Sequence, residues 1–383
     1  MTIFNYDIHG GTAEQRLEAL RQYASAKGVA PFKKSAYTNN HIHTFYSFSP
    51  YSPTEAVYMA KAAGLSSAGI VDHDTMAGAR EFLAAGEILN LPTTVGAECR
   101  VSFADTELSG YRLNSPDQLS VAYMVLHSVP HKYIETVTDF FAPYRAKRNL
   151  RNFEMVQKLN KLLDCALDFE RDVLTLSKHS EGGSVTERHL MYALAHKIVV
   201  NLGKGQPVVD YLMKELAIHL SDKLVQRLND VENDYYLFDL LGVLKSNFLP
   251  RIFIAASDEL PSVKALIDFA ADIDAILAYA YLGDVEESVT GDKPKQTFED
   301  AYLEQLFETL RTLHIKALTY MPTRNTAQQL KRVQQLCRQY SMLEISGEDV
   351  NSPRQSFICE QLTLPDFKHL SESTWHLIEH ERK

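Results

Sequence analysis

Histidine and acidic side chains gather at three points of the N-terminal third, each at the end of a short strand-like segment. The three points are NHIHT at 40–44, VDHDT at 71–75 and GAE at 96–98. Successive side chains of a β-strand point to opposite faces, so His41 and His43 share one face and Ile42 packs on the other. His73 and Glu98 end the next two segments, and imidazole and carboxylate groups both bind divalent metals. We therefore expect a metal site at the ends of three strands.

The segments that carry these groups alternate with helical patterns. Early strands are expected at 37–43, 67–71, 93–97 and 121–126, and early helices at 53–63 and 76–89. The alternation returns later, with strands at 251–254, 275–278, 317–320 and 342–345 and helices at 261–271, 297–313 and 326–340. This pattern predicts a parallel sheet or barrel that carries its chemistry at the C-terminal ends of the strands.

Four segments follow from this alternation. Residues 1–35 are expected to form an N-terminal helical extension, because TAEQ at 12–15 is typical of a capped helix start. Residues 36–133 form the first half of the barrel, and residues 250–383 form its second half together with a C-terminal segment. Residues 134–249 contain long helical patterns without a convincing strand, which predicts a helical insertion between barrel strands.

The composition limits the classes of partner. The chain has 383 residues, of which 45% are hydrophobic, and its 39 basic and 49 acidic residues give a formal net charge of −10. This negative charge opposes binding to nucleic acid, and no apolar run approaches the length of a membrane span. The N-terminus lacks the features of a signal peptide, and the four cysteines form no Cys-x-x-Cys pair. We expect a cytoplasmic protein with reduced thiols; nothing indicates its oligomeric state.

Five motifs are similar, in their order and spacing, to the N-terminal motifs of the members of a known superfamily. They are HIHTFYS at 41–47, SPTE at 52–55, AKAAGL at 60–65, IVDHDT at 70–75 and GAE at 96–98. The chain resembles the PHP (polymerase and histidinol phosphatase) superfamily, and within it the stand-alone metal-dependent phosphoesterases. The resemblance implies an α/β fold, a distorted (β/α)7 TIM-like barrel, with divalent ions at its C-terminal mouth. For this chain it implies one to three ions, with one or two favoured.

The resemblance also assigns metal ligands. His41 and His43 would bind one ion together with Glu98, which can bridge to a second ion, and with Asp349 in SGEDVN at 346–351. Two imidazoles and two carboxylates suit manganese, iron or zinc. His73 is the one ligand that remains of a third ion site.

Other ligand positions of the family are altered in this chain. Phe48 stands where an acidic residue is usual, Asn351 replaces a terminal histidine, and Tyr279 stands where a late strand-end histidine is usual. His127 ends the strand expected at 121–126 and could bind the second ion, although another register would place Tyr123 there. His131 is a weaker candidate. The alternative for both histidines is a hydrogen bond to the backbone.

The resemblance further implies substrate-binding and catalytic residues. Arg188 and His189, in the helix start of 184–194, and Arg148, on the preceding helix, would face the site and meet a phosphate. For Arg148 the alternative is a solvated helix face. Asp72 and His73 are expected in the catalytic machinery, with Asp72 orienting a metal-binding imidazole. Asp74 and Thr75 are expected to cap the following helix.

Three functions are compatible with these features. The first is a metal-dependent phosphoesterase that hydrolyses a small phosphorylated metabolite or nucleotide. The second is a degenerate PHP module with reduced metal content and a binding or regulatory role, as the changes at Phe48, Tyr279 and Asn351 would allow. The third is a metal-dependent amidohydrolase, because such enzymes also begin with His-x-His on a barrel strand.

Overall fold

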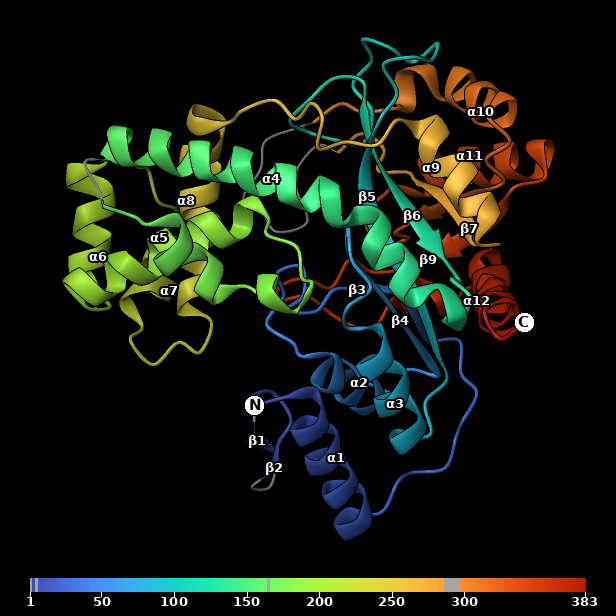
Figure 1. Ribbon diagram of the computed structural model, residues 1–383, viewed down its shortest axis with the longest axis horizontal. Helices are drawn as coiled ribbons and strands as arrows, with labels where there is room; N and C mark the ends of the chain where they lie inside the picture. The colour runs from blue at the N-terminus through green and yellow to red at the C-terminus, as the bar shows by residue number, and fades with distance from the viewer. Residues whose placement is uncertain (1, 4–5, 164–165, 286–295) are drawn as a thin grey trace.

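A seven-stranded sheet forms the centre of the molecule in the computed structural model, which describes residues 2–3, 6–163, 166–285 and 296–383 (Figure 1). The strands follow the order β3-β4-β5-β6-β7-β8-β9. They are β3 (Thr38–Ile42), β4 (Ser67–His73), β5 (Thr93–Ser102), β6 (Val121–His127), β7 (Ile276–Ala280), β8 (Ala317–Tyr320) and β9 (Leu343–Ser346). A separate two-stranded sheet pairs β1 (Thr2–Ile3) with β2 (Tyr6–Asp7).

The sheet curves into a nearly closed barrel. Its first and last strands meet through the backbone beyond β9, where the His43 N–H donates to the Val350 carbonyl at 3.0 Å and the Val350 N–H donates to the His41 carbonyl at 3.0 Å. The expected distorted TIM-like barrel is therefore confirmed. Asp349, next to Val350, is held at the mouth beside the two histidines by this closure.

One strand runs against the others. β6 pairs antiparallel with both β5 and β7, whereas the other neighbouring pairs are parallel. The connection at 103–120 contains turns and no helix, so the chain returns directly beside β5 instead of crossing back over the sheet. The expectation of an all-parallel sheet is wrong at this strand, and the N-terminal end of β6 lies at the mouth.

Helices cover the outer face of the barrel and close its far end. The outer helices are α2 (Pro53–Ala62), α3 (Ala79–Leu89), α9 (Val263–Asp272), α10 (Leu303–Thr312) and α11 (Ala327–Tyr340). α12 (Lys368–His380) brings Leu377 against the inward-facing Ala278 and Ala317. After it, Glu381 accepts hydrogen bonds from the start of β5. The end of the barrel opposite the histidines is thus covered by α12 and Glu381.

The N-terminal helix α1 (Ala13–Lys27) packs beneath α2 and α3. Its capping box is present as predicted, since the Thr12 side chain accepts from the Gln15 N–H and the Gln15 side chain accepts from the Thr12 N–H. Arg16, 1% exposed, forms a bidentate ion pair with Glu81 of α3. This buried pair fixes the helix to the barrel.

Helices also fill the chain between β6 and β7, and they form a second core beside the barrel (Figure 1). The main helices are α4 (Ile134–Leu163), α5 (Glu187–Leu202), α6 (Gln206–Asp210), α7 (Asp222–Asn229) and α8 (Tyr236–Ile252). The expected strand at 251–254 is wrong, because α8 extends to Ile252, which continues the buried face of Phe248 and Leu249. The segment boundaries at residues 35, 133 and 249 stay predictions.

Two further expectations concern cysteines and membranes. Cys99, Cys337 and Cys359 are buried and form no disulfide, while Cys165 lies outside the described residues. Across the part of the chain that the structure describes, no helix has both the length and the apolar character needed to cross a bilayer.

Candidate metal centre

Five side chains from four places in the sheet meet at the mouth of the barrel. His41 lies in β3 and His43 directly follows it, His73 ends β4, Glu98 lies in β5, and Asp349 follows β9. The register pairs His73 with Glu98, so their side chains lie on the same face of the sheet. The structure therefore brings together residues from the motifs at 40–44, 71–75, 96–98 and 346–351.

The donor atoms of these residues converge. Oε1 of Glu98 lies 3.6 Å from Nε2 of His41, and Oε2 lies 3.5 Å from Nε2 of His43 and 3.1 Å from Nδ1 of His73. Oδ1 of Asp349 lies 3.3 Å from Nε2 of His43. Two groups of three donors have the spacing of a metal site: His41, His43 and Asp349, and His43, His73 and Glu98.

The chemistry of the site fits a divalent ion. Nε2 of His43 is buried and has no hydrogen-bond partner among the described residues, which is costly unless another ligand satisfies it. Burial and the neighbouring His43 hold the pKa of His73 well below its usual range, so its imidazole is neutral and able to bind a metal. Burial opposes ionisation of Asp349, but His43, His41 and His73 lower its pKa, so the carboxylate is charged.

His41 carries the opposite pKa shift. Burial lowers its pKa, yet the charges of Glu98 and Asp349 outweigh burial and raise it overall. Two carboxylates thus place negative potential on this part of the mouth. A bound cation would take the place of the proton on His41, because imidazole binds metals in its deprotonated form.

Asp72 acts on the site through a serine. It is 1% exposed and accepts hydrogen bonds from the Thr44 N–H at 2.7 Å, the Thr44 hydroxyl at 2.5 Å and the Ser47 hydroxyl at 2.6 Å. Because the Ser47 hydroxyl donates to Asp72, its oxygen accepts from Nδ1 of His43, 3.3 Å away. This chain of hydrogen bonds places the imidazole proton on Nδ1 and leaves Nε2 for a metal.

Comparison with known proteins identifies the family. The model of the PHP domain matches residues 39–230, half of the chain. The chain belongs to the PHP domain family. No curated protein sequence matches it.

Solved structures agree on the fold. A provisionally assigned metal-dependent phosphoesterase from Bifidobacterium adolescentis aligns with TM-score 0.55 and 20% identity, covering 85% of this chain and 93% of its own. An amidohydrolase from Chromobacterium violaceum, with bound sulfate and no metal, aligns with TM-score 0.56 and 14% identity, covering 88% of this chain and 96% of its own. At sequence identities this low, the two structural matches establish a shared fold and no shared activity.

His127 does not join the other histidines of this PHP domain. It lies at the C-terminal end of β6, and because that strand is antiparallel, this end is directed away from the mouth. Nε2 of His127 is buried without a partner among the described residues, and burial, with His41 nearby, lowers its pKa to about 3. Tyr123 lies at the mouth instead, with its ring centroid 5.9 Å from that of His73. His131 is also remote, 3.3 Å from Glu381 at the closed end.

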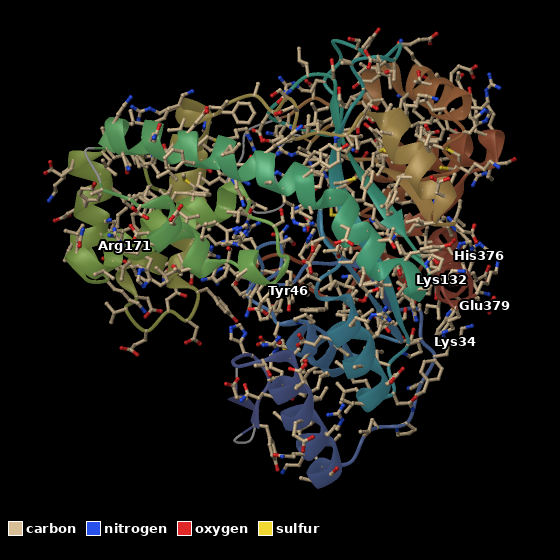
Figure 2. All side chains as sticks on the ribbon, in the orientation of Figure 1. Lys34, Tyr46, Lys132, Arg171, His376 and Glu379 are labelled. Atoms are coloured by element: carbon tan, nitrogen blue, oxygen red, sulfur yellow. The ribbon has the colours of Figure 1, made fainter. Side chains whose placement is uncertain are left out.

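Phe48 turns away from the mouth and joins the helical core. Its ring packs edge-on against His189 and Tyr192, at centroid distances of 4.8 and 5.6 Å. Its φ of 85° lies in the left-handed region, where side chains other than glycine are strained. Near it, the Ser184 N–H donates to the carbonyl of Tyr46, which Figure 2 labels where the barrel meets the helical segment. The loop after His43 is thus held by the helices.

Tyr279 faces a different side of the sheet from the metal ligands. The inward residue of β7 is Ala278, whereas Tyr279 packs in the core between the barrel and its outer helices. Its hydroxyl donates to Glu299 at 2.9 Å. The interpretation of Tyr279 as a lost ligand is therefore wrong, because strand alternation points this position outward.

Arg148 is not solvated, and it meets carboxylates of the protein. Its side chain is 4% exposed, forms an ion pair with Asp74, and lies 3.4 Å from Oε1 of Glu259. Asp74 therefore does not cap the next helix as expected, and Thr75 donates to the Gly182 carbonyl instead. The N-cap of α3 is Gly78.

The ion pairs of Arg148 extend into a larger buried network. Arg100 of β5 and Arg151 of α4 also pair with Glu259, at 2.6 and 2.7 Å, and Arg151 pairs with Glu187 at the start of α5. Together with Arg148 and Asp74, three arginines meet three acids between the barrel and the helices. The sequence analysis missed Arg100, Arg151, Glu187 and Glu259, since no local motif marks them.

Arg188 and His189 occupy different environments. Arg188 is half-buried, donates to the side chain of Asn351 at 2.5 Å, and stacks over the ring of Phe48. Asn351 in turn donates to the Asp349 carboxylate at 2.6 Å, so Arg188 is two contacts from a candidate metal ligand. His189 is buried and caps its own helix, because its Nδ1 accepts from the Thr186 N–H. Burial and Arg188 lower the pKa of His189 to about 3.

One further cation at the mouth escaped the sequence analysis. Arg324 follows β8 and donates to the Leu282 carbonyl at 3.1 Å. Burial lowers the pKa of Arg324, while the charges of Glu299 and Asp349 oppose that shift. A basic residue just beyond a strand end, as in YMPTR at 320–324, was the available signal.

Proposed function

We propose that this PHP protein is a metal-dependent phosphoesterase that hydrolyses a small phosphorylated metabolite or nucleotide. The observation that carries the proposal is the convergence of three imidazoles and two carboxylates around the unpartnered Nε2 of His43. His41, His43, Glu98 and Asp349 would hold the ion, with His73 beside them. This donor set suits manganese, iron or zinc, and the resemblance to the family allows one to three ions.

The residues of the mouth have distinct tasks in such a reaction. A bound ion would supply Lewis acidity for attack on phosphorus. Ser47 and Asp72 orient His43. Arg188 and Arg324 would bind phosphate oxygens, since guanidinium offers paired donors of fixed geometry. Arg148 is the weakest of the predicted phosphate ligands, because Asp74 and Glu259 already engage it.

The size and charge of the substrate follow from the same features. The net charge of −10 disfavours a nucleic-acid strand, whose binding depends on many cations. Sulfate is a tetrahedral anion like phosphate, and the Chromobacterium violaceum neighbour binds it. A small anion that needs only two arginines is therefore the favoured ligand.

Two other functions remain as candidates. The name of the same neighbour supports an amidohydrolase with this fold. The orientation of Phe48 supports a degenerate module, because its ring belongs to the helical core and offers no metal ligand. In a degenerate module, Arg188 and Asn351 would serve binding without turnover.

Phosphate release from a panel of small phosphate esters tests the proposal. We expect turnover by the manganese- or zinc-loaded protein, loss of turnover with a chelator, and a fall of at least about a hundredfold in kcat for Glu98→Gln. Glu379→Gln is the matched control, because Glu379 is exposed on α12 and lies far from Tyr46 in Figure 2.

Each other outcome selects another candidate. Hydrolysis of amides without hydrolysis of phosphate esters would favour the amidohydrolase. Metal binding without turnover on either panel would favour the degenerate module. Turnover that survives Glu98→Gln would contradict a role for this site.

A further inference from the structure

Tyr123 lies near the N-terminal end of β6, the end that the antiparallel direction of this strand brings to the mouth. The register pairs Val125 with Glu98 and Tyr123 with Arg100, so the side chain of Tyr123 lies on the face of the sheet that carries Glu98. Two residues of a strand span about 7 Å, so the backbone of Tyr123 lies that far beyond Glu98 toward the rim. Its ring centroid is 5.9 Å from that of His73. The phenol therefore stands beside the candidate metal ligands.

The backbone of Tyr123 is held by one side chain of the connection at 103–120. Asn114, which is 3% exposed, accepts from the Tyr123 N–H at 2.6 Å and donates to the Tyr123 carbonyl at 2.9 Å. Its Nδ2 also donates to the carbonyl of Ala280 in β7 at 2.5 Å. Because a buried side chain ties this position to the neighbouring strand, the ring of Tyr123 has a fixed point of attachment at the mouth.

The hydroxyl of Tyr123 differs from those of two other tyrosines in the sheet. Tyr279 donates to Glu299 at 2.9 Å, and Tyr320 donates to Glu344 at 2.8 Å. Tyr123 is half-buried, yet within the described ranges its hydroxyl has no hydrogen-bond partner. Tyrosine hydroxyls in such positions usually have one. The partner of Tyr123 must therefore come from solvent or from a bound ligand.

The cations of the mouth lie on another side of it. Arg324 follows β8, and Arg188 donates to the segment that follows β9. β6 lies between β5 and β7 in the order of the strands, apart from β8 and β9. Beside it on β5, Arg100 lies 2.6 Å from Oε1 of Glu259, so its charge is already compensated. Tyr123 thus adds an uncharged donor on a side of the mouth where the arginine is engaged by the protein.

An uncharged donor suits this place. A phenol has an ordinary pKa of about 10, so it carries its proton at neutral pH and can donate to an anion. Unlike a guanidinium, it would not repel a divalent ion held a few ångströms away. A transferring phosphoryl group spreads its charge over three oxygens, and donors on different sides of it are needed to stabilise them all.

We propose that the hydroxyl of Tyr123 donates a hydrogen bond to an oxygen of the substrate's phosphate group, across the mouth from Arg188 and Arg324. This inference rests on the proposed function and adds a substrate-contacting residue to it. The proton stays on the phenol, so the bond contributes by stabilising charge. Such a bond strengthens as charge on the oxygen grows, and it therefore contributes to kcat as well as to binding.

Tyr123→Phe tests the hydroxyl, because phenylalanine keeps the ring beside His73 and removes the donor. With the zinc-loaded protein, we expect kcat/KM for the best ester of the phosphate panel to fall about a hundredfold. The affinity for inorganic phosphate, measured by calorimetry, should fall about tenfold. Tyr235→Phe is the matched control, since Tyr235 is exposed in the helical segment and its ring lies under Arg354. It should change neither quantity.

Zinc affinity distinguishes a hydrogen-bond donor from a metal ligand. We expect Tyr123→Phe to bind zinc as tightly as the unaltered protein, whereas His43→Gln should lose tight binding. His376→Gln is the matched control for zinc, since His376 is exposed on α12 and lies at the edge of the molecule in Figure 2. Weaker zinc binding by a folded Tyr123→Phe protein would make the phenol a ligand of the ion and overturn the proposal.

The remaining outcomes separate this inference from the proposed function. Circular dichroism and thermal melting establish that each variant folds, and a hydroxyl without a partner in the protein should be removed without loss of stability. Unchanged turnover and phosphate affinity in Tyr123→Phe would overturn the inference and leave the phosphoesterase intact. Weaker phosphate binding by Tyr123→Phe, in a protein that hydrolyses no ester, would support the inference while the proposed function fails. If the unaltered zinc-loaded protein binds no phosphate, both are wrong.

Discussion

Ser47 transmits the effect of Asp72 to His43, and this link makes a prediction for single residues. Ser47→Ala removes the acceptor for Nδ1–H of His43 and one of the donors to Asp72. Groups that orient a metal-binding histidine typically contribute tenfold to a hundredfold in affinity, so we expect zinc affinity to fall by about that factor. Competition with a chromophoric chelator measures the change.

The matched control is Ser109→Ala, because Ser109 is exposed in the connection at 103–120 and is not one of the residues that meet at the mouth. We expect it to keep the zinc affinity of the unaltered protein. If Ser47→Ala binds zinc equally well, the hydroxyl does not orient His43.

The spacing of residues in the sequence was enough to predict part of the site. It failed for the remaining part for a structural reason. His41 and His43 lie on one face because strand side chains alternate, and Glu98 meets His73 because β4 and β5 are parallel and in register. The same reasoning misplaced His127, since it assumed that β6 ends at the mouth. Strand direction depends on the whole connection at 103–120, which no single motif encodes.

At the scale of elements, the buried network between the barrel and α4 should contribute strongly to stability. Arg148→Met keeps most of the apolar stem but leaves Asp74 and Glu259 without one of their buried partners. Removing one partner of a buried ion pair typically costs about 3 to 5 kcal/mol, because the other charge stays buried. We expect a loss of that size in the free energy of unfolding in urea.

Arg80→Met is the matched control for this loss. Arg80 of α3 pairs with Glu135 of α4, but both side chains are more than half exposed, at 55% and 63%. Exposed pairs contribute about 0 to 1 kcal/mol. Equal losses in the two variants would show that the network adds nothing beyond an ordinary surface pair.

Glu299, which holds the loop after β7, makes the free energy of unfolding depend on pH. Burial raises the pKa of Glu299 to about 7, although hydrogen bonds from Gly283 and Tyr279 oppose the shift. The unfolded chain releases this proton near pH 4.5, whereas the folded chain keeps it to about pH 7. The contribution of Glu299 is therefore full below pH 4.5 and is lost as pH rises through 7, by roughly 3 kcal/mol in all.

Glu299→Gln tests this contribution, because glutamine does not titrate. Unfolding in urea at pH 5 and pH 8 should show a smaller loss of stability for the variant than for the unaltered protein. Glu379→Gln, at an exposed position, should keep the original difference. An unchanged difference in Glu299→Gln would contradict the assignment.

The sequence predicted helix and strand boundaries correctly where the side chains that set a boundary contact residues close to them in the chain. Thr12 and Gln15 form a cap within one turn, so the sequence sufficed to predict it. Asp74 looked equally suited to a cap, but its partner Arg148 lies 74 positions away. The strand expected at 251–254 failed for a related reason, because Ile252 completes a helix face that packs in the second core.

At the scale of the whole molecule, the residues of the metal centre come from both the first and the last strand of the sheet, where the barrel closes. His41 and His43 belong to the first strand of the sheet and its end, and Asp349 follows the last strand. Between those strands the closure is made by the two backbone hydrogen bonds of Val350 and by the side-chain amides of Asn39 and Asn40, which donate to the carbonyls of Glu348 and Ser346. An ion held by residues from both sides would therefore strengthen the closure.

Metal loading should stabilise the protein and slow hydrogen exchange at this closure. An ion that binds only the folded state adds about 2.7 kcal/mol when its free concentration is a hundred times its dissociation constant. We expect zinc to raise the melting temperature and to slow exchange of the His43 and Val350 amides, which donate the closing bonds. His376→Gln should respond to zinc as the unaltered protein does, and His43→Gln should not respond. Stabilisation without slower exchange at Val350 would place the ion somewhere other than between the first and last strands.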